Sequence, residues 1–235
     1  ALAYVAAAAS DMAHHAADES TRAQNQAVYE YLVPVVKGFS TEMSIDMASL
    51  GVQVHGGMGY IEETGAAQHY RDARILTIYE GTTAIQANDI VGRKTLRDHG
   101  AMAKVLCARI ATTEQDLAAH DNEDCTAMLG ALRQGRLALE EAIEFIVANG
   151  KSDPKTVYAG AVNYLNLAGV VLCGWQMGRA MMIALDKMDS DPAFFAAKLI
   201  TGRFYAESVL PQAAGLSQSI RLAGTTTNRM SVAMF

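Results

Sequence analysis

The sequence predicts an all-α protein, and three observations carry that prediction. Half of its 235 residues are apolar, 51%, which is enough to build a substantial core. Apolar residues recur at the three- and four-residue spacing of one helix face over long stretches. The pairs Asp153-Pro154 and Asp191-Pro192 place a capping residue directly before a proline, which is typical of a helix start.

Two helices are expected at the beginning of the chain. Residues 1–25 are rich in alanine and other helix formers and lack proline and glycine, so they predict a continuous helix. Residues 28–54 predict a second helix, with Pro34 tolerated in its first turns. In this second helix the spacing predicts one buried stripe, which consists of Met43, Met47, Leu50 and Val54.

Two shorter helices follow. A polar connection, residues 62–65, leads to a brief helix over residues 66–73. Thr82 or Thr83 can accept a hydrogen bond from a free backbone amide and so cap the next helix, which extends to about Arg97.

The second half of the chain predicts an up-and-down helical bundle. Apolar positions between residues 102 and 117 indicate one helix, and a polar break at residues 120–124 separates it from another with one apolar and one charged face. The two Asp-Pro starts open the remaining helices, the last of which runs to Leu216 or beyond. Short loops between four helices favour this arrangement. We therefore divide the chain into domains at residues 1–97 and 98–235, and residues 101–235 contain no evident catalytic cluster.

Composition and residue spacing narrow the functional classes. The net charge of −6, with scattered lysines and arginines, argues against a nucleic-acid surface. Three widely spaced cysteines fit neither a disulfide framework nor a zinc site, and they indicate a cytoplasmic protein with reduced thiols. Adjacent residues on a helix point about 100° apart, so His14 and His15 do not share a metal, and we expect no metal site. The apolar segment 159–185 contains Asn163 and Arg179, which favours a core helix over a membrane span.

Two stretches suggest a functional site. In Ile78-Tyr79-Glu80-Gly81-Thr82-Thr83, a carboxylate stands directly before a glycine and a helix start, where free amides favour an anionic ligand. In Gln53-Val54-His55-Gly56-Gly57-Met58-Gly59-Tyr60, three glycines in four positions allow the backbone to approach a bulky anion. Each stretch alone also fits a purely structural role: a solvated glutamate, a capping threonine without a ligand, or a glycine that ends a helix.

The order of these motifs resembles the C-terminal helical domain of the flavin-dependent acyl-CoA dehydrogenases. The resemblance covers about the first 97 residues and is strongest from Gln53 to Gln86, where Tyr70-Arg71-Asp72-Ala73-Arg74-Ile75 links the two stretches. Residues 98–235 look like the additional C-terminal helical domain of larger members. The resemblance therefore implies an acyl-CoA dehydrogenase C-terminal helical bundle plus a second helical bundle.

The resemblance also implies roles for single residues. Glu80 is the expected catalytic base, which removes the α-proton of an acyl-CoA thioester while the β-hydrogen leaves as a hydride to FAD. Gly81 is expected beside the thioester. The expected FAD contacts are Gln53, Gly56, Gly57, Thr82 and Ala84, the first three reaching the cofactor of a neighbouring subunit. Arg71 and Asp72 are expected to support the catalytic loop.

The same resemblance implies partners and leaves alternatives open. The N-terminal helical and β domains of the family are absent from these 235 residues, so we expect the C-terminal part of a longer enzyme that is inactive alone. Electron-transfer flavoprotein is the expected acceptor, and a homodimer or homotetramer is the expected assembly. The alternatives are a helical oligomerisation module without its own activity, and part of an acyl-CoA oxidase.

Overall fold

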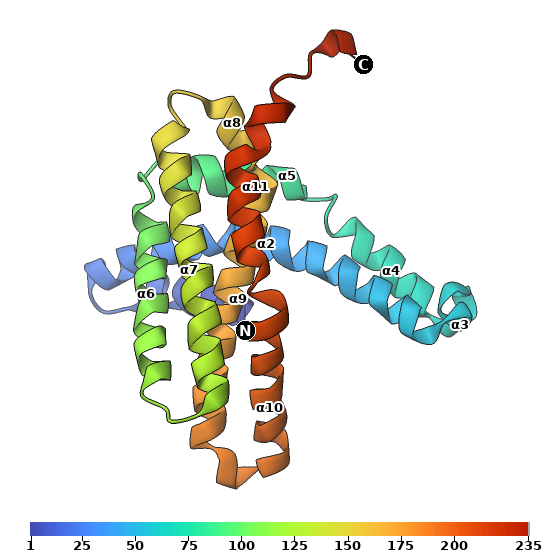
Figure 1. Ribbon diagram of the computed structural model, residues 1–235, viewed down its shortest axis with the longest axis vertical. Helices are drawn as coiled ribbons and strands as arrows, with labels where there is room; N and C mark the ends of the chain where they lie inside the picture. The colour runs from blue at the N-terminus through green and yellow to red at the C-terminus, as the bar shows by residue number, and fades with distance from the viewer. Residues whose placement is uncertain (235) are drawn as a thin grey trace.

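A computed structural model describes residues 1–234 and confirms the all-α prediction, because no strand occurs within those residues. Eleven α-helices account for most of the chain (Figure 1). They are α1 (Leu2–His15), α2 (Glu19–His55), α3 (Gly57–Tyr60), α4 (Ala66–Ile75), α5 (Thr83–Val91), α6 (Ala101–Ala118), α7 (Glu123–Asn149), α8 (Pro154–Ala159), α9 (Ala161–Asp186), α10 (Pro192–Phe204) and α11 (Gln212–Thr227). The 3₁₀ segments η1 (Glu62–Thr64), η3 (Met188–Ser190) and η5 (Val232–Met234), and the π-helical segments η2 (Gly92–Leu96) and η4 (Tyr205–Val209), are short.

The boundary between the first two helices differs from the prediction. The helix expected over residues 1–25 ends at His15, and Ala16 is extended. The Asp18 carboxylate then accepts a hydrogen bond of 2.7 Å from the Thr21 amide and starts α2 at Glu19. A short side chain that caps a new helix outweighs the alanine-rich propensity around it. As a result Pro34 lies in the interior of α2 rather than in its first turns, where it leaves one carbonyl without its helical donor.

The predicted buried stripe on α2 is exposed. Met43, Met47, Leu50 and Val54 are 43%, 55%, 54% and 84% accessible to solvent. They lie on the second half of α2, which together with α3 and α4 projects away from the bundle (Figure 1). We call this projection, residues 43–75, the arm. The periodicity identified a shared helix face correctly, but burial also requires a covering element, and none within residues 1–234 covers these four side chains.

The second half of the chain forms the predicted up-and-down bundle. α6, α7, α9 and the α10–α11 pair lie side by side, and η4 marks the bend between α10 and α11 (Figure 1). The predicted apolar face of α7 is buried at Leu132, Leu139, Ile143 and Ile146. On its other side Arg136 donates to both carboxylate oxygens of the buried Glu114 on α6, at 2.6 and 3.1 Å. This bidentate pair links α6 to α7.

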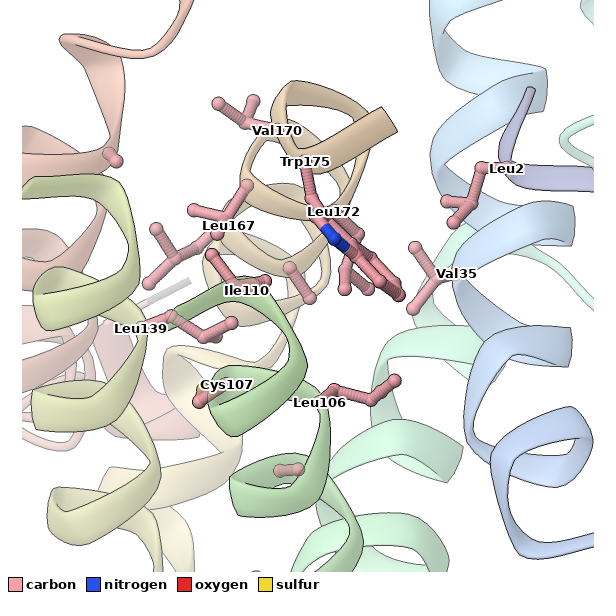
Figure 2. Packing of buried hydrophobic residues seen from close by; sticks show 14 of the residues in the cluster. Leu2, Val35, Leu106, Cys107, Ile110, Leu139, Leu167, Val170, Leu172 and Trp175 are labelled. Carbon is pink, nitrogen blue, oxygen red and sulfur yellow. The ribbon is translucent and has the colours of Figure 1, made fainter. Parts of the chain in front are cut away.

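Helix α9 is the core helix that the sequence predicted. It is the one helix within residues 1–234 that is long and apolar enough to cross a membrane by length and composition, and 67% of its most apolar window is buried inside the protein. Its single tryptophan, Trp175, donates a hydrogen bond of 2.8 Å to Thr113 on α6. Figure 2 shows Trp175 extending from α9 toward the side on which Leu2 and Val35 lie. α9 therefore contacts elements from both halves of the sequence.

Helices α2 and α9 pack closely through glycines. The ring of Phe39 lies against Gly169, where an added Cβ would be 2.2 Å from the ring carbon Cγ. A buried hydrogen-bond chain reinforces this contact, since the Tyr164 hydroxyl is 3.0 Å from the hydroxyls of both Tyr31 and Thr95. The two parts of the chain thus share one buried cluster. The division at residues 1–97 and 98–235 stays a prediction.

Candidate active site

Glu80 occupies a tight bend between α4 and α5. Its backbone φ is 50° and that of Gly81 is 97°, so two consecutive residues adopt the left-handed region. A glycine does so without cost, whereas a glutamate is strained there, and such strain is common at functional sites. The Glu80 side chain is exposed. A Cβ at Gly81 would lie 2.5 Å from Gln86 Nε2, the end of a flexible side chain that can move aside, so the positive φ is what favours glycine here.

Lys37 of α2 contacts the loop that leads into this bend. Its ammonium donates to the carbonyl oxygens of Leu76, at 2.5 Å, and Tyr79, at 3.1 Å, and lies 5.6 Å from the centre of the Tyr79 ring. Two charge-assisted bonds from α2 thus hold the loop before Glu80, one of them at Tyr79, the residue that directly precedes it. Sequence reasoning missed Lys37. The signal was a single lysine in the otherwise uncharged run Val33-Pro34-Val35-Val36-Lys37-Gly38-Phe39.

Glu42 and Arg74 support the two sides of the bend. The Thr83 hydroxyl donates to the Glu42 carboxylate, which ties the start of α5 to α2. Arg74 donates a bond of 2.6 Å to the Thr77 hydroxyl. The supporting role predicted for Arg71 and Asp72 is not what the structure has, because Asp72 accepts from Gln68 within α4 and no side-chain bond of Arg71 occurs within residues 1–234. α4 turns both residues outward, and Arg74 contacts the loop instead.

Several backbone amides at this bend are available to a ligand. Thr82 caps α5 as predicted, with its hydroxyl 3.4 Å from the Ile85 amide. Within the described chain the N–H groups of Glu80, Gly81, Thr82 and Ala84 have no hydrogen-bond acceptor. These donors, together with the positive end of the α5 dipole, favour an anion or a developing negative charge next to the Glu80 carboxylate.

The glycine turn predicted to contact a cofactor lies elsewhere. Gly56 ends α2 with φ 61°, and its amide donates a bond of 3.1 Å to the carbonyl of Gln53. Gln53, Gly56 and Gly57 are exposed, and Cβ atoms at the two glycines would meet nothing within 4 Å. The turn and the Glu80 bend lie at opposite ends of α4 (Figure 1), a helix about 15 Å long by its ten residues. The structure therefore brings Glu80, Gly81, Thr82 and Ala84 together but not Gln53, Gly56 and Gly57 with them.

Comparison with known families gives two matches. Residues 1–96 match the family described as "Acyl-CoA dehydrogenase, C-terminal domain". Residues 106–231 match the family described as "Acetyl-CoA dehydrogenase C-terminal like". The two matches lie on either side of the segment that connects η2 to α6.

Comparison with curated proteins gives relatives of the same kind. A 3-methylmercaptopropionyl-CoA dehydrogenase of Ruegeria pomeroyi is 46% identical over 85% of this chain and 34% of its own length. A butyryl-CoA dehydrogenase of Syntrophomonas wolfei is 29% identical over 92% of this chain and 36% of its own length. The caffeyl-CoA reductase-Etf complex subunit CarC of Acetobacterium woodii is 41% identical over 25% of this chain and 15% of its own length.

The chain therefore spans about a third of the length of the first two relatives. The family matches cover both halves of its sequence, and the Ruegeria relative extends over most of it. This protein belongs to the acyl-CoA dehydrogenase family.

Proposed function

We propose that this chain is the C-terminal part of an FAD-dependent acyl-CoA dehydrogenase and that Glu80 is its catalytic base. The observation that carries the proposal is the strained, anchored conformation of Glu80. Lys37 and Glu42 hold the backbone on either side of Glu80, and the amides of the bend have no partner within residues 1–234. A solvated surface glutamate needs neither the left-handed backbone nor the two supports from α2.

In the proposed removal of the α-proton, each residue of the bend has a separate role. The Glu80 carboxylate accepts the proton from the carbon next to the thioester carbonyl. Negative charge then develops on the carbonyl oxygen, and the Glu80 backbone N–H is a donor free to stabilise it. Gly81, which lacks a side chain, leaves room for the thioester beside the carboxylate. Lys37 bonds the Tyr79 carbonyl and so holds the backbone from which the Glu80 side chain and amide extend.

The exposed donors fit FAD as the cofactor. When bound, FAD accepts the β-hydrogen of the acyl chain as a hydride. Thr82 and Ala84 of this chain would hold it at the start of α5, where the unpaired amides suit an electron-rich ring edge or phosphate. Gln53, Gly56 and Gly57 would hold the cofactor of a neighbouring subunit, because the arm places them about one length of α4 from Glu80.

The partners follow from the same proposal. The missing N-terminal and β domains, or a second subunit in a homodimer or homotetramer, would cover the apolar face of the arm. Electron-transfer flavoprotein is the proposed electron acceptor, and the name of the Acetobacterium relative includes an Etf complex. The proposed location is the cytoplasm, since the thiols of Cys107, Cys125 and Cys173 are free.

The substrate class is an acyl-CoA thioester. The names of two relatives specify a butyryl group and a methylmercaptopropionyl group, both of which are short. We propose 3-methylmercaptopropionyl-CoA and butyryl-CoA as the first substrates to assay, with a long-chain acyl-CoA as the comparison.

Glu80→Gln in the full-length enzyme tests the catalytic role. The substitution keeps size and hydrogen bonding but removes the base, so we expect loss of substrate-induced flavin bleaching by about 10²-fold or more, while FAD stays bound. The measurement is stopped-flow absorbance at the flavin band, with Glu63→Gln on the exposed arm as the control. Normal bleaching in the Glu80→Gln enzyme would show that another group removes the proton.

A flavin titration of the 235-residue chain tests whether this part is active alone. We expect weak FAD binding and little turnover, because the glycine turn and the α5 site on one chain lie too far apart to hold one reacting flavin ring. Stoichiometric FAD with bleaching by acyl-CoA would show that the other domains are dispensable. The exposed arm favours the alternative of an oligomerisation module, and size-exclusion chromatography with and without FAD distinguishes the two, since a pure module assembles without flavin.

A further inference from the structure

The side chain of Gln86 on α5 lies against the glycine that follows Glu80. Its amide nitrogen is 2.5 Å from the position that a Cβ on Gly81 would occupy, and no other side chain comes nearer to that position. Side chains on a helix tilt toward its N-terminus, which carries Gln86 back onto the residues that precede α5. Because Gly81 has no side chain, it leaves the Gln86 carboxamide uncovered.

The near end of the Gln86 side chain is fixed between helices. Its Cβ is 3.1 Å from the position that a Cβ on Gly38 of α2 would occupy. The buried Leu165 of α9 fills the same space, with its Cδ2 atom 2.6 Å from that position. The Gln86 backbone N–H donates a bond of 3.0 Å to the Thr82 carbonyl. The side chain therefore starts from a fixed point, while the carboxamide at its far end can turn toward a ligand.

The Gln86 carboxamide has no hydrogen-bond partner within residues 1–234. Lys37, Arg74 and Thr83 all use their donors on acceptors of the described chain, but no side-chain hydrogen bond of the bend involves Gln86. The residue is only partly buried, and the buried side-chain atom that lacks a partner in this part of the chain belongs to Gln176. The carboxamide of Gln86 is therefore accessible to a ligand at the bend.

An apolar side chain would be the usual choice at the position of Gln86. Thr82 caps α5, so Gly81 is the residue before the cap and Gln86 is the fourth residue of the helix. These two positions commonly hold apolar side chains that pack together and fix the angle at which the chain enters a helix. A carboxamide without a partner adds nothing to such a contact. Its donor is instead free for an acceptor atom outside the described chain.

We propose that the Gln86 carboxamide donates a hydrogen bond to the carbonyl oxygen of the bound acyl-CoA thioester. The α-carbon of the substrate must contact the Glu80 carboxylate, and the carbonyl oxygen is two bonds from that carbon, which puts it beside Gly81. Negative charge develops on this oxygen as the α-proton leaves, and an amide donor next to the Glu80 backbone N–H stabilises that charge. The proposal rests on the function proposed for Glu80.

Gln86→Met in the full-length enzyme removes the donor and keeps the length of the side chain. We expect flavin reduction at saturating butyryl-CoA to slow by about 10²-fold, the usual effect of removing one donor to a developing oxyanion. FAD content and melting temperature should be unchanged, because the fold does not use the carboxamide. Stopped-flow absorbance measures the rate. The matched control is Asn88→Leu, which removes an exposed carboxamide from the same helix.

A substrate analogue tests the hydrogen bond itself. In 3-thiabutyryl-CoA a sulfur atom replaces the β-carbon, so no β-hydrogen can leave and the reaction stops once the α-carbon is ionised. Carbon-13 NMR of the labelled α-carbon gives the pH at which the bound analogue ionises. This midpoint should rise by about one pH unit or more in Gln86→Met, because a hydrogen bond to the charged form lowers a pKa. Asn88→Leu should leave it unchanged.

The outcomes distinguish this inference from the function on which it rests. Normal flavin reduction in Gln86→Met, an unchanged ionisation midpoint, or a loss as large in Asn88→Leu would overturn the role of Gln86. Glu80→Gln is measured in the same assay. Normal reduction in Glu80→Gln would contradict the proposed base, whereas loss of reduction in Glu80→Gln with a normal rate in Gln86→Met would contradict the donor alone.

Discussion

Lys37 is the residue on which the geometry of the Glu80 bend most depends. Its ammonium bonds two carbonyls of the loop, those of Leu76 and Tyr79, and no other side chain within residues 1–234 reaches either oxygen. The residue does not act on the substrate in the proposed mechanism. It holds the backbone of the loop directly before Glu80.

Lys37→Met in the full-length enzyme should therefore slow the chemical step without removing the cofactor. Methionine keeps the apolar length of the side chain but loses both bonds, and a displacement of about 1 Å at a reacting group can reduce a rate by about 10²-fold. We expect flavin reduction to slow by at least tenfold at unchanged FAD content, measured by stopped-flow absorbance. Lys94→Met is the control, because its ammonium pairs with Glu30 on the protein surface. An equal loss in both variants would indicate a general effect of charge.

The residues of the loop itself were predictable from the sequence, but the side chains of α2 that hold the loop were not. Glu80, Gly81 and Thr82 were predicted because their types and order are local properties of one loop. Lys37 and Glu42 are about forty residues away, and their contacts depend on how α2 packs against α4 and α5. Arg71 and Asp72 were chosen over Arg74 because sequence proximity does not show which side of a short helix faces the loop.

At the scale of elements, the contact between α2 and α9 rests on Gly169. The Phe39 ring occupies the space of its missing side chain, with ring atoms 2.2 to 2.6 Å from an ideal Cβ. Gly130 in α7 is a helical glycine too, but nothing lies within 4 Å of its Cβ position. Alanine substitutions at Gly169 and Gly130 therefore distinguish the effect of close packing from the effect of helix propensity.

Gly169→Ala should lower the free energy of unfolding by about 1–3 kcal/mol, because the ring and helix must shift to admit the methyl group. Gly130→Ala should raise it by up to about 1 kcal/mol, since alanine is the better helix former. Urea unfolding followed by circular dichroism measures both. Stabilisation of similar size in the two variants would show that α2 and α9 are not held this closely in solution.

Helix boundaries were predictable where a single residue determines them. Asp153 and Asp191 cap α8 and α10 as expected, each through a bond to the amide three residues later. The break after His15 was missed because Asp18 lies within a run of strong helix formers, and the benefit of a cap is visible only once the chain turns there. The prediction that the apolar stripe on α2 is buried was wrong for a different reason. Periodicity defines a face, but what covers that face is a property of the assembly.

At the scale of the whole molecule, one buried cluster joins the bundle to the helices that present Glu80. Tyr31, Thr95 and Tyr164 form a hydrogen-bonded group within it, and Cys107 on α6 is 1% exposed in the same cluster. Because groups from both halves of the sequence share this interior, we expect it to unfold as a unit. Ionisation of any one buried group should then affect the stability of the entire chain.

Burial raises the pKa of the Cys107 thiol from 9.0 to about 12. The folded state therefore retains a proton that the unfolded chain loses. The thiol's contribution is complete below pH 9 and is lost as the pH rises toward the folded value. Between pH 8 and pH 10.5, we expect Cys107 to reduce the free energy of unfolding by about 2 kcal/mol, since one pKa unit corresponds to 1.36 kcal/mol. Urea unfolding of the protein and of Cys107→Ala at both pH values measures this contribution. The alanine variant should show a smaller alkaline loss, and a parallel decline in the two proteins would contradict a thiol kept neutral by burial.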